Sequence, residues 1–505
     1  MRKVLIANRG EIAVRVIRAC REAGLSTVAV YSECDRTALH VRRADEAYAI
    51  GPSAPRESYL RIDRVIETAR RSGADAVHPG YGFLAENEAF ARAVRDAGLT
   101  FIGPSPEAIA LMGSKTAARA AARRAGVPVV PGSDDPIPAG AGDEDILNRG
   151  DATGYPLLVK AVSGGGGKGM RTVLGRDDLL DGVRAARSEA GTAFGDPSVY
   201  LERRLARPRH IEVQVLGDSH GTVLPFVERE CSIQRRHQKV VEETPSLAVT
   251  TEQRKAITAA AAAVAKSVGY TNAGTVEFLL DEDGRFYFLE MNTRLQVEHP
   301  ITEAVTGLDL VRWQLRIADG HPLTLDPARL LTPDGHAIEC RIYAEDPDNG
   351  FLPSPGRILD LRPPAGPGIR DDSAAHAGLD VPIYYDAMIS KLIAWAEDRQ
   401  AAIARMRRAL DEYVIFGIKT TLPFFSWLLE TPEFVDGRFH TAYLDEVLAA
   451  RNGRPFVRPT AEQEDIAAIA AAVHAMLSPA SPQAEARPDH ARAWRAQARA
   501  EGLRD

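Results

Sequence analysis

Short apolar runs alternate with segments of helical periodicity along the first hundred or so residues of the chain. The alternation predicts strands at residues 3–7, 27–31 and 76–78, and helices at residues 12–23 and 59–72. Strands that alternate with helices are typical of a parallel α/β domain, and we expect residues 1–114 to form one. The first strand-to-helix turn lacks G-x-G-x-x-G, which argues against a dinucleotide site there.

Two apolar runs between residues 277 and 292 carry one carboxylate each. The runs flank an Asp/Gly cluster at residues 281–284, so we expect a β-hairpin with Glu277 on one strand and Glu290 on the other. Proteins usually offer Mg²⁺ one or two carboxylates, and substrate phosphates complete its coordination. The hairpin is therefore a candidate metal site.

Four polar residues alternate at the end of the second strand and beyond it, namely Asn292, Arg294, Gln296 and Glu298. An extended chain would place all four on one face, where they offer an amide, a cation and a base to a small anion. A solvated polar face is the alternative. It accounts for a single glutamate, but not for this ordered set beside two candidate metal ligands.

Four consecutive glycines at positions 164–167 lie between predicted strands at residues 156–160 and 170–173. Glycine allows backbone N–H groups to turn toward a phosphate and to approach it closely. The segment does not match the P-loop, because Met170 follows Gly169 where that motif has lysine. We interpret it as a mobile phosphate lid, with a flexible linker as the alternative.

Other polar groups are candidates for the same site. Lys115 and Lys160 could contact phosphate, although a single lysine is more often a solvated surface residue. Residues 209–215 and 228–239 are dense in side chains that bind phosphate, ribose and small anions, or they form a basic surface patch. Arg341 lies mid-strand between apolar neighbours and needs a partner there; a structural ion pair and a catalytic cation both fit.

Two further segments leave alternatives open. Tyr81 lies in a Gly/Pro-punctuated segment, which is either a binding loop or a structural turn with a packed tyrosine. The tail, residues 449–505, contains apolar residues at helical spacing and then a Pro/Ala/Ser-rich stretch. It is either a docking or dimer-flanking element or a disordered remnant. Its apolar positions are Ile466, Ile469, Val473, Met476 and Leu477.

Composition narrows the class of protein. A chain of 505 residues can hold two to four domains, and its net charge of −7 argues against a general nucleic-acid binder. Four cysteines without C-x-x-C spacing make structural zinc and a disulfide framework unfavourable. No apolar run is long enough for a membrane helix, and no signal peptide precedes the first strand. We therefore expect a cytoplasmic enzyme that does not bind the membrane.

Four motifs together resemble biotin carboxylase, an ATP-grasp enzyme. They are Lys160-Ala-Val-Ser-Gly-Gly-Gly-Gly-Lys-Gly-Met170, Arg209-His-Ile-Glu-Val-Gln214, Glu228-Arg-Glu-Cys-Ser-Ile-Gln-Arg-Arg-His-Gln-Lys239 and Glu290-Met-Asn-Thr-Arg-Leu-Gln-Val-Glu-His-Pro300. The resemblance implies an α/β chain with an ATP-grasp fold: a Rossmann-like N-terminal domain (1–114), a mobile lid (115–203), and a catalytic core with an α+β C-terminal domain (204–448).

The same resemblance implies roles for individual residues. Nucleotide contacts would come from Lys115, Lys160, Gly164, Gly165, Gly166, Gly167, Gly169, Met170, Glu202, Leu205, His210, Gln234, His237, Glu277 and Glu290. Glu277, Glu290 and Asn292 would hold Mg²⁺ or Mn²⁺, two ions being expected. Bicarbonate and biotin would meet Tyr81, Lys239, Arg294, Gln296, Val297, Glu298 and Arg341. The catalytic set among these would be Glu298 as base, Arg341, Lys239 and Arg294.

The implied activity is ATP- and bicarbonate-dependent carboxylation of biotin through carboxyphosphate. No methionine is followed by lysine, so the Met-Lys-Met biotin acceptor is absent and biotin would arrive on a separate carrier protein. The other expected partners are a second copy of the chain, in a homodimer, and a carboxyltransferase subunit. The final acceptor stays open among acetyl-CoA, as used in fatty acid biosynthesis, propionyl-CoA and pyruvate. Rival interpretations are another ATP-grasp ligase that makes an acyl or carbamoyl phosphate, and an inactive nucleotide-sensing protein.

Overall fold

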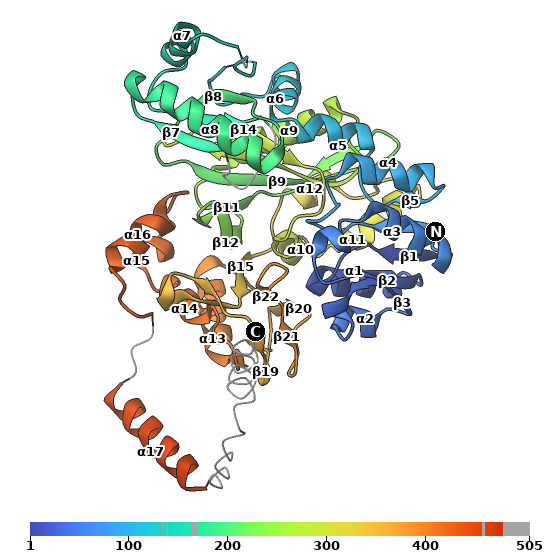
Figure 1. Ribbon diagram of the computed structural model, residues 1–505, viewed down its shortest axis with the longest axis vertical. Helices are drawn as coiled ribbons and strands as arrows, with labels where there is room; N and C mark the ends of the chain where they lie inside the picture. The colour runs from blue at the N-terminus through green and yellow to red at the C-terminus, as the bar shows by residue number, and fades with distance from the viewer. Residues whose placement is uncertain (134, 139, 163–168, 457–459, 478–505) are drawn as a thin grey trace, which may run out of the picture. The chain divides into compact units, whose positions relative to one another are not determined.

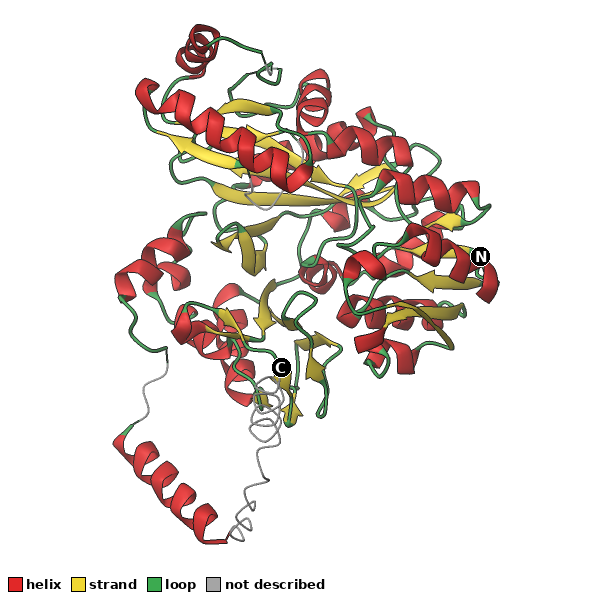
Figure 2. Ribbon diagram, in the orientation of Figure 1, coloured by secondary structure: helices red, strands yellow, loops and turns green. Residues whose placement is uncertain are grey.

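Helices pack against several β-sheets in the larger part of the chain (Figures 1 and 2). The computed structural model describes residues 1–133, 135–138, 140–162, 169–456 and 460–477. Residues 1–454 form one compact unit, and residues 455–505 form a second.

The N-terminal part is a parallel five-stranded sheet in the order β3-β2-β1-β4-β5, which confirms the predicted α/β class. Neighbouring residues of β1 enter different cores: Val4 packs with Ile12 of α1, and Leu5 packs with Val65 of α3. Both faces are therefore buried, which explains the uninterrupted apolar runs. The elements are β1 Lys3–Ile6, α1 Gly10–Glu22, β2 Ser26–Ser32, α2 Leu39–Arg43, β3 Glu46–Gly51, α3 Ile62–Ser72, β4 Ala76–His78, α4 Glu88–Asp96, β5 Thr100–Phe101 and α5 Pro106–Gly113.

A small antiparallel sheet, β7-β6-β8, follows in the sequence. Leu157 and Val159 of β6 pack beneath Leu179 and Val183 of α8, which lies across the sheet (Figure 1). Strands β6 and β7 confirm the two strands predicted on either side of the glycine segment. The elements are α6 Lys115–Arg124, α7 Asp143–Thr153, β6 Leu157–Ala161, β7 Met170–Val173, α8 Leu179–Phe194 and β8 Val199–Arg203.

The largest sheet has nine strands, in the order β14-β13-β9-β11-β12-β15-β22-β20 with β10 beside β9. Neighbouring strands of this sheet are antiparallel, and β13 and β14 form the predicted hairpin. The elements are β9 Arg209–Gly217, β10 Val223–Pro225, β11 Arg229–Arg235, β12 Gln238–Thr244, α9 Thr251–Ser267, β13 Asn272–Leu280, β14 Phe286–Asn292, α10 His299–Thr306, α11 Leu310–Ala318, α12 Pro327–Leu330, β15 His336–Tyr343, β20 Ile369–Ser373, β22 Met388–Ala396 and α13 Arg399–Glu412.

Short elements complete the first unit, and buried ion pairs tie its segments together. Glu303 of α10 accepts hydrogen bonds from Arg15 of α1 at 2.8 Å and from Arg370 of β20 at 2.6 Å. One carboxylate thus connects segments that are almost 300 residues apart. The remaining elements are β16 Glu345–Asp346, β17 Leu352–Pro353, β18 Gly356–Arg357, β19 Asp360–Arg362, β21 Asp380–Val381, β23 Val414–Phe416, α14 Leu422–Leu428, α15 Pro432–Val435 and α16 Tyr443–Arg451.

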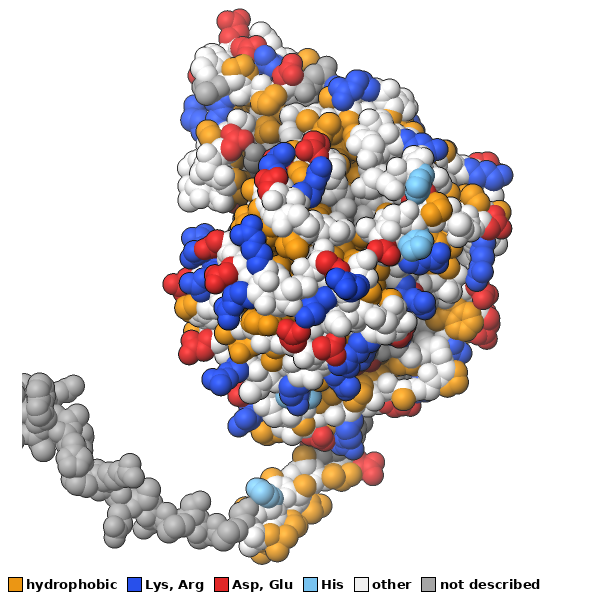
Figure 3. Space-filling view, turned by 90° about the vertical axis from the view of Figure 1, so that its right-hand side faces the viewer, with side chains coloured by type: hydrophobic (Ala, Val, Ile, Leu, Met, Phe, Trp, Pro, Cys, Tyr) orange, Lys and Arg blue, Asp and Glu red, His pale blue; other side chains and the backbone are white. Residues whose placement is uncertain are grey.

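The second unit contains the predicted tail helix, α17 (Ala461–Leu477). Its apolar side chains are exposed, from 47% at Val473 to 86% at Met476, and Figure 3 shows them along the helix. The Pro/Ala/Ser-rich stretch predicted to follow it lies outside the described residues. None of the helices in the described part of the chain is long and apolar enough to cross a membrane.

Candidate active site

Lys239 stands at the centre of a buried cluster of carboxylates. Its Nζ, on β12, donates hydrogen bonds to Glu277 at 2.8 Å, to Glu298 at 2.7 Å, and to Glu212. Burial alone would lower the pKa of Lys239, but the three carboxylates raise it well above the ordinary value. Lys239 therefore stays positively charged, and its hydrogen bonds connect its own strand to three other segments of the chain.

Glu298 lies between two cations just before α10. Besides Lys239, its carboxylate accepts a hydrogen bond from Arg341 Nη2 at 2.9 Å. Burial would raise the pKa of Glu298, but Lys239 and Arg341 lower it well below its usual range. Glu298 is thus a wholly buried carboxylate that stays ionised. Arg341 also donates from Nε to Glu242 at 2.6 Å, so this residue has the partners that its place in an apolar strand requires, and a catalytic role stays open.

Glu277 and Glu290 face one another across the β13–β14 hairpin, as predicted. Glu277 accepts hydrogen bonds from Asn292 Nδ2 at 2.8 Å and from Gln296 Nε2 at 3.2 Å. Burial opposes ionisation of both glutamates, yet Lys239 and then His210 lower the pKa of Glu277. By contrast, burial and the Glu277 charge raise the pKa of Glu290. Within the described residues, Glu290 has no ion-pair partner.

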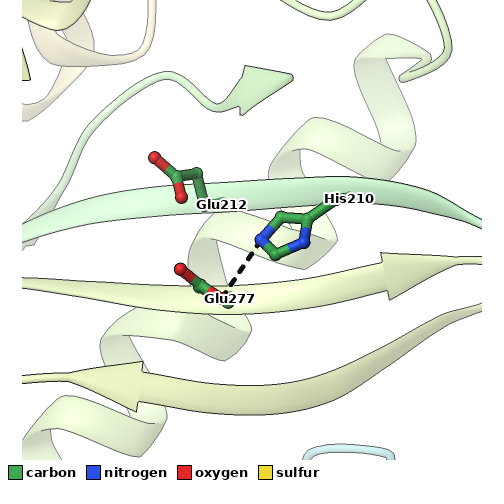
Figure 4. A group of neighbouring side chains, drawn as sticks. All are labelled: His210, Glu212 and Glu277. Carbon is green, nitrogen blue, oxygen red and sulfur yellow. Dashed lines mark ion pairs between the residues drawn. The ribbon is translucent and has the colours of Figure 1, made fainter. Parts of the chain in front are cut away.

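A second group of possible metal ligands lies beside the hairpin. His210, Glu212 and Glu277 bring their ligand atoms within 4.8 Å of one another, and His210 Nε2 is 3.1 Å from Glu277 (Figure 4). The two oxygens of Glu212 already accept hydrogen bonds from Arg229 and Lys239. Glu212 therefore offsets the charge of two buried cations here.

The alternating polar run beyond β14 is not extended, which corrects the sequence prediction. The strand ends at Asn292, and the chain then bends before turning into α10. The side chains still gather on one side, because Arg294 donates to Gln296 Oε1 at 2.8 Å and to Asn292 Oδ1 at 3.2 Å. Glu86, from the N-terminal part, accepts a bond from Arg294 Nε at 2.8 Å and fixes the guanidinium from outside.

A second cluster connects the small sheet to the predicted nucleotide residues. Lys160 of β6 donates to Glu202 of β8, whose other oxygen accepts from Arg119 at 2.7 Å. Lys115 begins α6, and burial lowers its pKa, while the nearby Glu290 charge opposes that change. Lys115, Lys160 and Glu290 therefore lie within electrostatic reach of one another.

The remaining predicted nucleotide residues occupy different positions around these two clusters. Gly164–Gly167 lie outside the described residues, while Gly169 has a φ of +68° and accepts a hydrogen bond from Ala161 N. Gln234 Nε2 contacts His210 Nδ1 at 3.1 Å. Met170 begins β7, Leu205 packs with Val130 and Tyr287, and His237 occupies the β11–β12 turn with a φ of +67°.

A cavity of about 490 Å³ opens beside Glu298 and Arg341. Tyr81, Arg294, Val297 and Arg341 are among its lining residues, and this volume is in the ordinary range for small-molecule sites. Tyr81 both lines this cavity and packs against the hydrophobic core, so the binding-loop and packed-turn alternatives stay open. The wholly buried Lys391 donates to the Val297 carbonyl at 3.0 Å and lies 3.3 Å from Glu11, another residue of the cavity wall.

Several residues of these clusters have roles that were not predicted from the sequence. Glu212 alternates with His210 along β9, so period-two spacing was a usable signal. Arg119 lies in an alanine-rich helix and Lys391 in an apolar strand, and each acquires a partner only when distant segments meet. Such pairings leave no trace in local pattern. The residues without an assigned role are Glu86, Arg119, Glu212, Arg229, Glu242 and Lys391.

Comparison with known proteins gives consistent matches along the chain. Family models match as "Biotin carboxylase, N-terminal domain" over residues 1–109, "Carbamoyl-phosphate synthase L chain, ATP binding domain" over residues 114–326, and "Biotin carboxylase C-terminal domain" over residues 339–446. A pyruvate carboxylase subunit of Methanothermobacter thermautotrophicus is 52% identical over 445 residues, which are 88% of this chain and 89% of that protein. Biotin carboxylase 1 of Bacillus subtilis is 52% identical over 446 residues, which are 88% and 98% of the two chains.

A solved structure is similar over nearly the same range. It is the biotin carboxylase domain dimer of the Hydrogenobacter thermophilus 2-oxoglutarate carboxylase, in complex with MgADP, ADP and bicarbonate. The TM-score is 0.85 at 48% identity, covering 90% of this chain and 99% of that one.

Proposed function

The chain belongs to the biotin carboxylase family, and from this premise we propose that the cluster around Lys239 is where bicarbonate is activated. The protein is an ATP-dependent ligase that carboxylates biotin with ATP and bicarbonate. The observation that carries the proposal is Glu298, an ionised and buried carboxylate held between Lys239 and Arg341 beside the cavity.

We propose that the second cluster binds the nucleotide. Lys115 and Lys160 are buried or half-buried lysines suited to phosphate oxygens, and Glu202 holds Lys160 in place. The glycine segment would close over the phosphates from the lid. The other proposed nucleotide contacts are Gly164, Gly165, Gly166, Gly167, Gly169, Met170, Leu205, His210, Gln234 and His237.

The hairpin residues fit a hard divalent cation. Glu277 and Glu290 are adjacent carboxylates, and Asn292 adds an amide oxygen. Burial and the Glu277 charge raise the pKa of Glu290, and a bound cation would offset both effects. We propose these three as ligands of Mg²⁺, or of Mn²⁺. When bound, the metal would neutralise charge on the phosphoryl group being transferred.

The reaction then follows from the positions of the chain's own groups. Arg294, Gln296 and the Val297 N–H would bind bicarbonate beside Glu298, which removes its proton. The bicarbonate oxygen attacks the γ-phosphorus of ATP, the bond to ADP breaks, and Lys239 balances the charge that develops. Carboxyphosphate releases CO₂ and phosphate, and the phosphate takes the N1′ proton of biotin. Arg341 stabilises the enolate oxygen of biotin while N1′ attacks CO₂.

We infer further that biotin reaches this cavity on a separate carrier protein and that a carboxyltransferase subunit completes the carboxylase. The relative from Methanothermobacter is one subunit of pyruvate carboxylase, which supports a multi-subunit enzyme. The Hydrogenobacter domain crystallised as a dimer, which supports a homodimer here. We also propose that the enzyme acts in the cytoplasm. The acceptor would be a small acyl compound such as acetyl-CoA, propionyl-CoA, pyruvate or 2-oxoglutarate.

The direct experiment measures ADP release by the purified chain with Mg²⁺, with and without bicarbonate and free biotin. Bicarbonate-dependent ADP release together with carboxybiotin is expected. ATP turnover that is indifferent to both would overturn the proposed roles and favour another ATP-grasp ligase. Arg341→Ala tests the cavity directly: biotin carboxylation should fall by a larger factor than bicarbonate-dependent ATP hydrolysis, and equal losses would leave Arg341 a structural role only.

A further inference from the structure

Two glutamates face one another behind Arg341. Glu242 of β12 is directly opposite Glu339 of β15 in the sheet register. Both side chains are wholly buried. Among the described residues, neither oxygen of Glu339 and only Oε1 of Glu242 has a hydrogen-bond partner. Two buried carboxylates at this spacing are stable only if they carry fewer than two charges.

The surroundings decide which glutamate keeps its charge. Glu242 is engaged by Arg341, whereas Glu339 has only distant cations, Arg341 and Lys391, to offset its burial. Burial raises the pKa of Glu242 to about 7, and burial with the adjacent Glu242 raises that of Glu339 well above its usual range. Glu339 is therefore the member of the pair that holds a proton, and Glu242, which accepts a hydrogen bond from Arg341, is the member that can carry negative charge.

Arg341 is consequently held at two edges by carboxylates of different function. Nε donates to Glu242 Oε1 at 2.6 Å, Nη2 lies 2.5 Å from the same oxygen, and Nη2 also donates to Glu298 at 2.9 Å. Glu298 is the proposed base, so its negative charge disappears once it accepts the bicarbonate proton. At that moment the attraction between Glu298 and Nη2 weakens, while Glu242 still contacts both Nε and Nη2.

We propose that Glu242 is a positioning residue that keeps the guanidinium of Arg341 in place when proton transfer removes the negative charge of Glu298, so that the positive charge of Arg341 becomes available to the oxygen of biotin. This rests on the function proposed for Glu298 and Arg341. The only covalent change is the transfer of one proton from bicarbonate to Glu298. The geometry makes the two half-steps sequential: Arg341 is occupied before bicarbonate is activated and available to biotin afterwards.

The test compares Glu242→Gln with Glu243→Gln, two neighbouring buried glutamates on the same strand. Glu243 binds His336 at 2.9 Å and Arg399 at 2.7 Å, neither of which lines the cavity. In Glu242→Gln, kcat for biotin carboxylation should fall about 10-fold or more. Bicarbonate-dependent ATP hydrolysis and the KM for ATP should change by less than about 3-fold. In Glu243→Gln the ratio of the two activities should stay at its starting value even if the protein melts earlier.

An unchanged ratio in Glu242→Gln would overturn the inference. If that variant does not fold, Glu242→Asp serves in its place, because it keeps the charge but withdraws it by one methylene. The ratio of biotin carboxylation to bicarbonate-dependent ATP hydrolysis should fall in the same way, and a normal ratio would refute the proposed role of Glu242. Arg341→Ala distinguishes a failure of the role proposed for Arg341 from a failure of the role proposed for Glu242. Equal losses of both activities there refute the proposed role of Arg341, whereas a changed ratio there and a normal ratio in Glu242→Gln refute only the role of Glu242.

Discussion

Replacing Glu298 by glutamine removes the proposed base while keeping nearly the same shape. The amide cannot take the bicarbonate proton, so the step that makes bicarbonate a nucleophile is lost. The cations around it keep partners, since Lys239 retains Glu212 and Glu277 and Arg341 retains Glu242. The variant should therefore fold and lose chemistry rather than structure.

The expected losses of rate, stability and ATP affinity follow from these contacts. General-base catalysis contributes about 10²- to 10⁴-fold, which corresponds to about 3–5 kcal/mol of activation free energy. Breaking a buried ion pair outright costs about 3–5 kcal/mol of stability, and the remaining carboxylates should reduce that loss to less than about 3 kcal/mol. ATP affinity should change by less than about 1 kcal/mol, because Glu298 forms no contact with Lys160 or Glu202 among the described hydrogen bonds and ion pairs.

Three measurements on Glu298→Gln are decisive: bicarbonate-dependent ATP hydrolysis, ATP binding by calorimetry, and chemical denaturation. Glu228→Gln is the matched control, since Glu228 is wholly buried and pairs at 2.7 Å with Arg254, outside the cavity. The control should lose stability but keep bicarbonate-dependent turnover. A loss of ATP affinity as large as the loss of rate, or full turnover in Glu298→Gln, would refute the assignment of the base.

Further changes test the nucleotide cluster and the fold. Arg119→Met leaves the buried Glu202 with a single cation. This change should raise the KM for ATP about 10-fold with little change in kcat. An unchanged KM in steady-state kinetics would contradict the prediction. Gly169→Ala puts a Cβ 2.8 Å from Ala161 Cβ at a φ of +68°, so it should cost about 1–2 kcal/mol and weaken ATP binding, as measured by thermal shift with and without ATP. Burial lowers the pKa of His40 from 6.5 to about 4, so the unfolded chain binds the proton more tightly and stability should fall as the pH drops from about 6.5 to 4. This one histidine accounts for about 3 kcal/mol of that loss. In urea titrations, the difference in unfolding free energy between pH 7 and pH 5 should therefore be smaller for His40→Gln than for the unchanged protein. An identical pH dependence of the two proteins would refute the argument.

Local pattern predicted the features that depend on neighbouring residues. The hairpin with Glu277 on one strand and Glu290 on the other follows from two apolar runs and a turn, and the structure adds that the two residues are paired in its register. The bend after Asn292 was missed because alternation of polar residues is equally compatible with a strand and with a chain that folds back on itself. Arg294 then restores the common face through hydrogen bonds that no periodicity encodes.

Long-range partners were beyond the reach of the sequence. Arg341 was recognised as needing a partner, but its two partners come from β12 and from the turn before α10. Glu242 and Glu339 each read as an ordinary polar residue of a strand, and only the sheet register makes them neighbours. The predicted division of residues 1–448 into three domains stays a prediction, as do the individual site roles.

The ion pairs of Glu303 and Lys391 bear on how this enzyme can be recombined. Glu303 joins α1 to α10 and β20, and Lys391 joins Glu11 to the Val297 carbonyl. An excised N-terminal segment would carry Arg15 and Glu11 into solvent without their counterparts. Lys391 would lose its nearest carboxylate and keep Asp372, at 3.8 Å, among the described ion pairs. Residues 1–454 should therefore melt in one cooperative transition. Chimaeras of related enzymes should keep activity only when these pairs are inherited together.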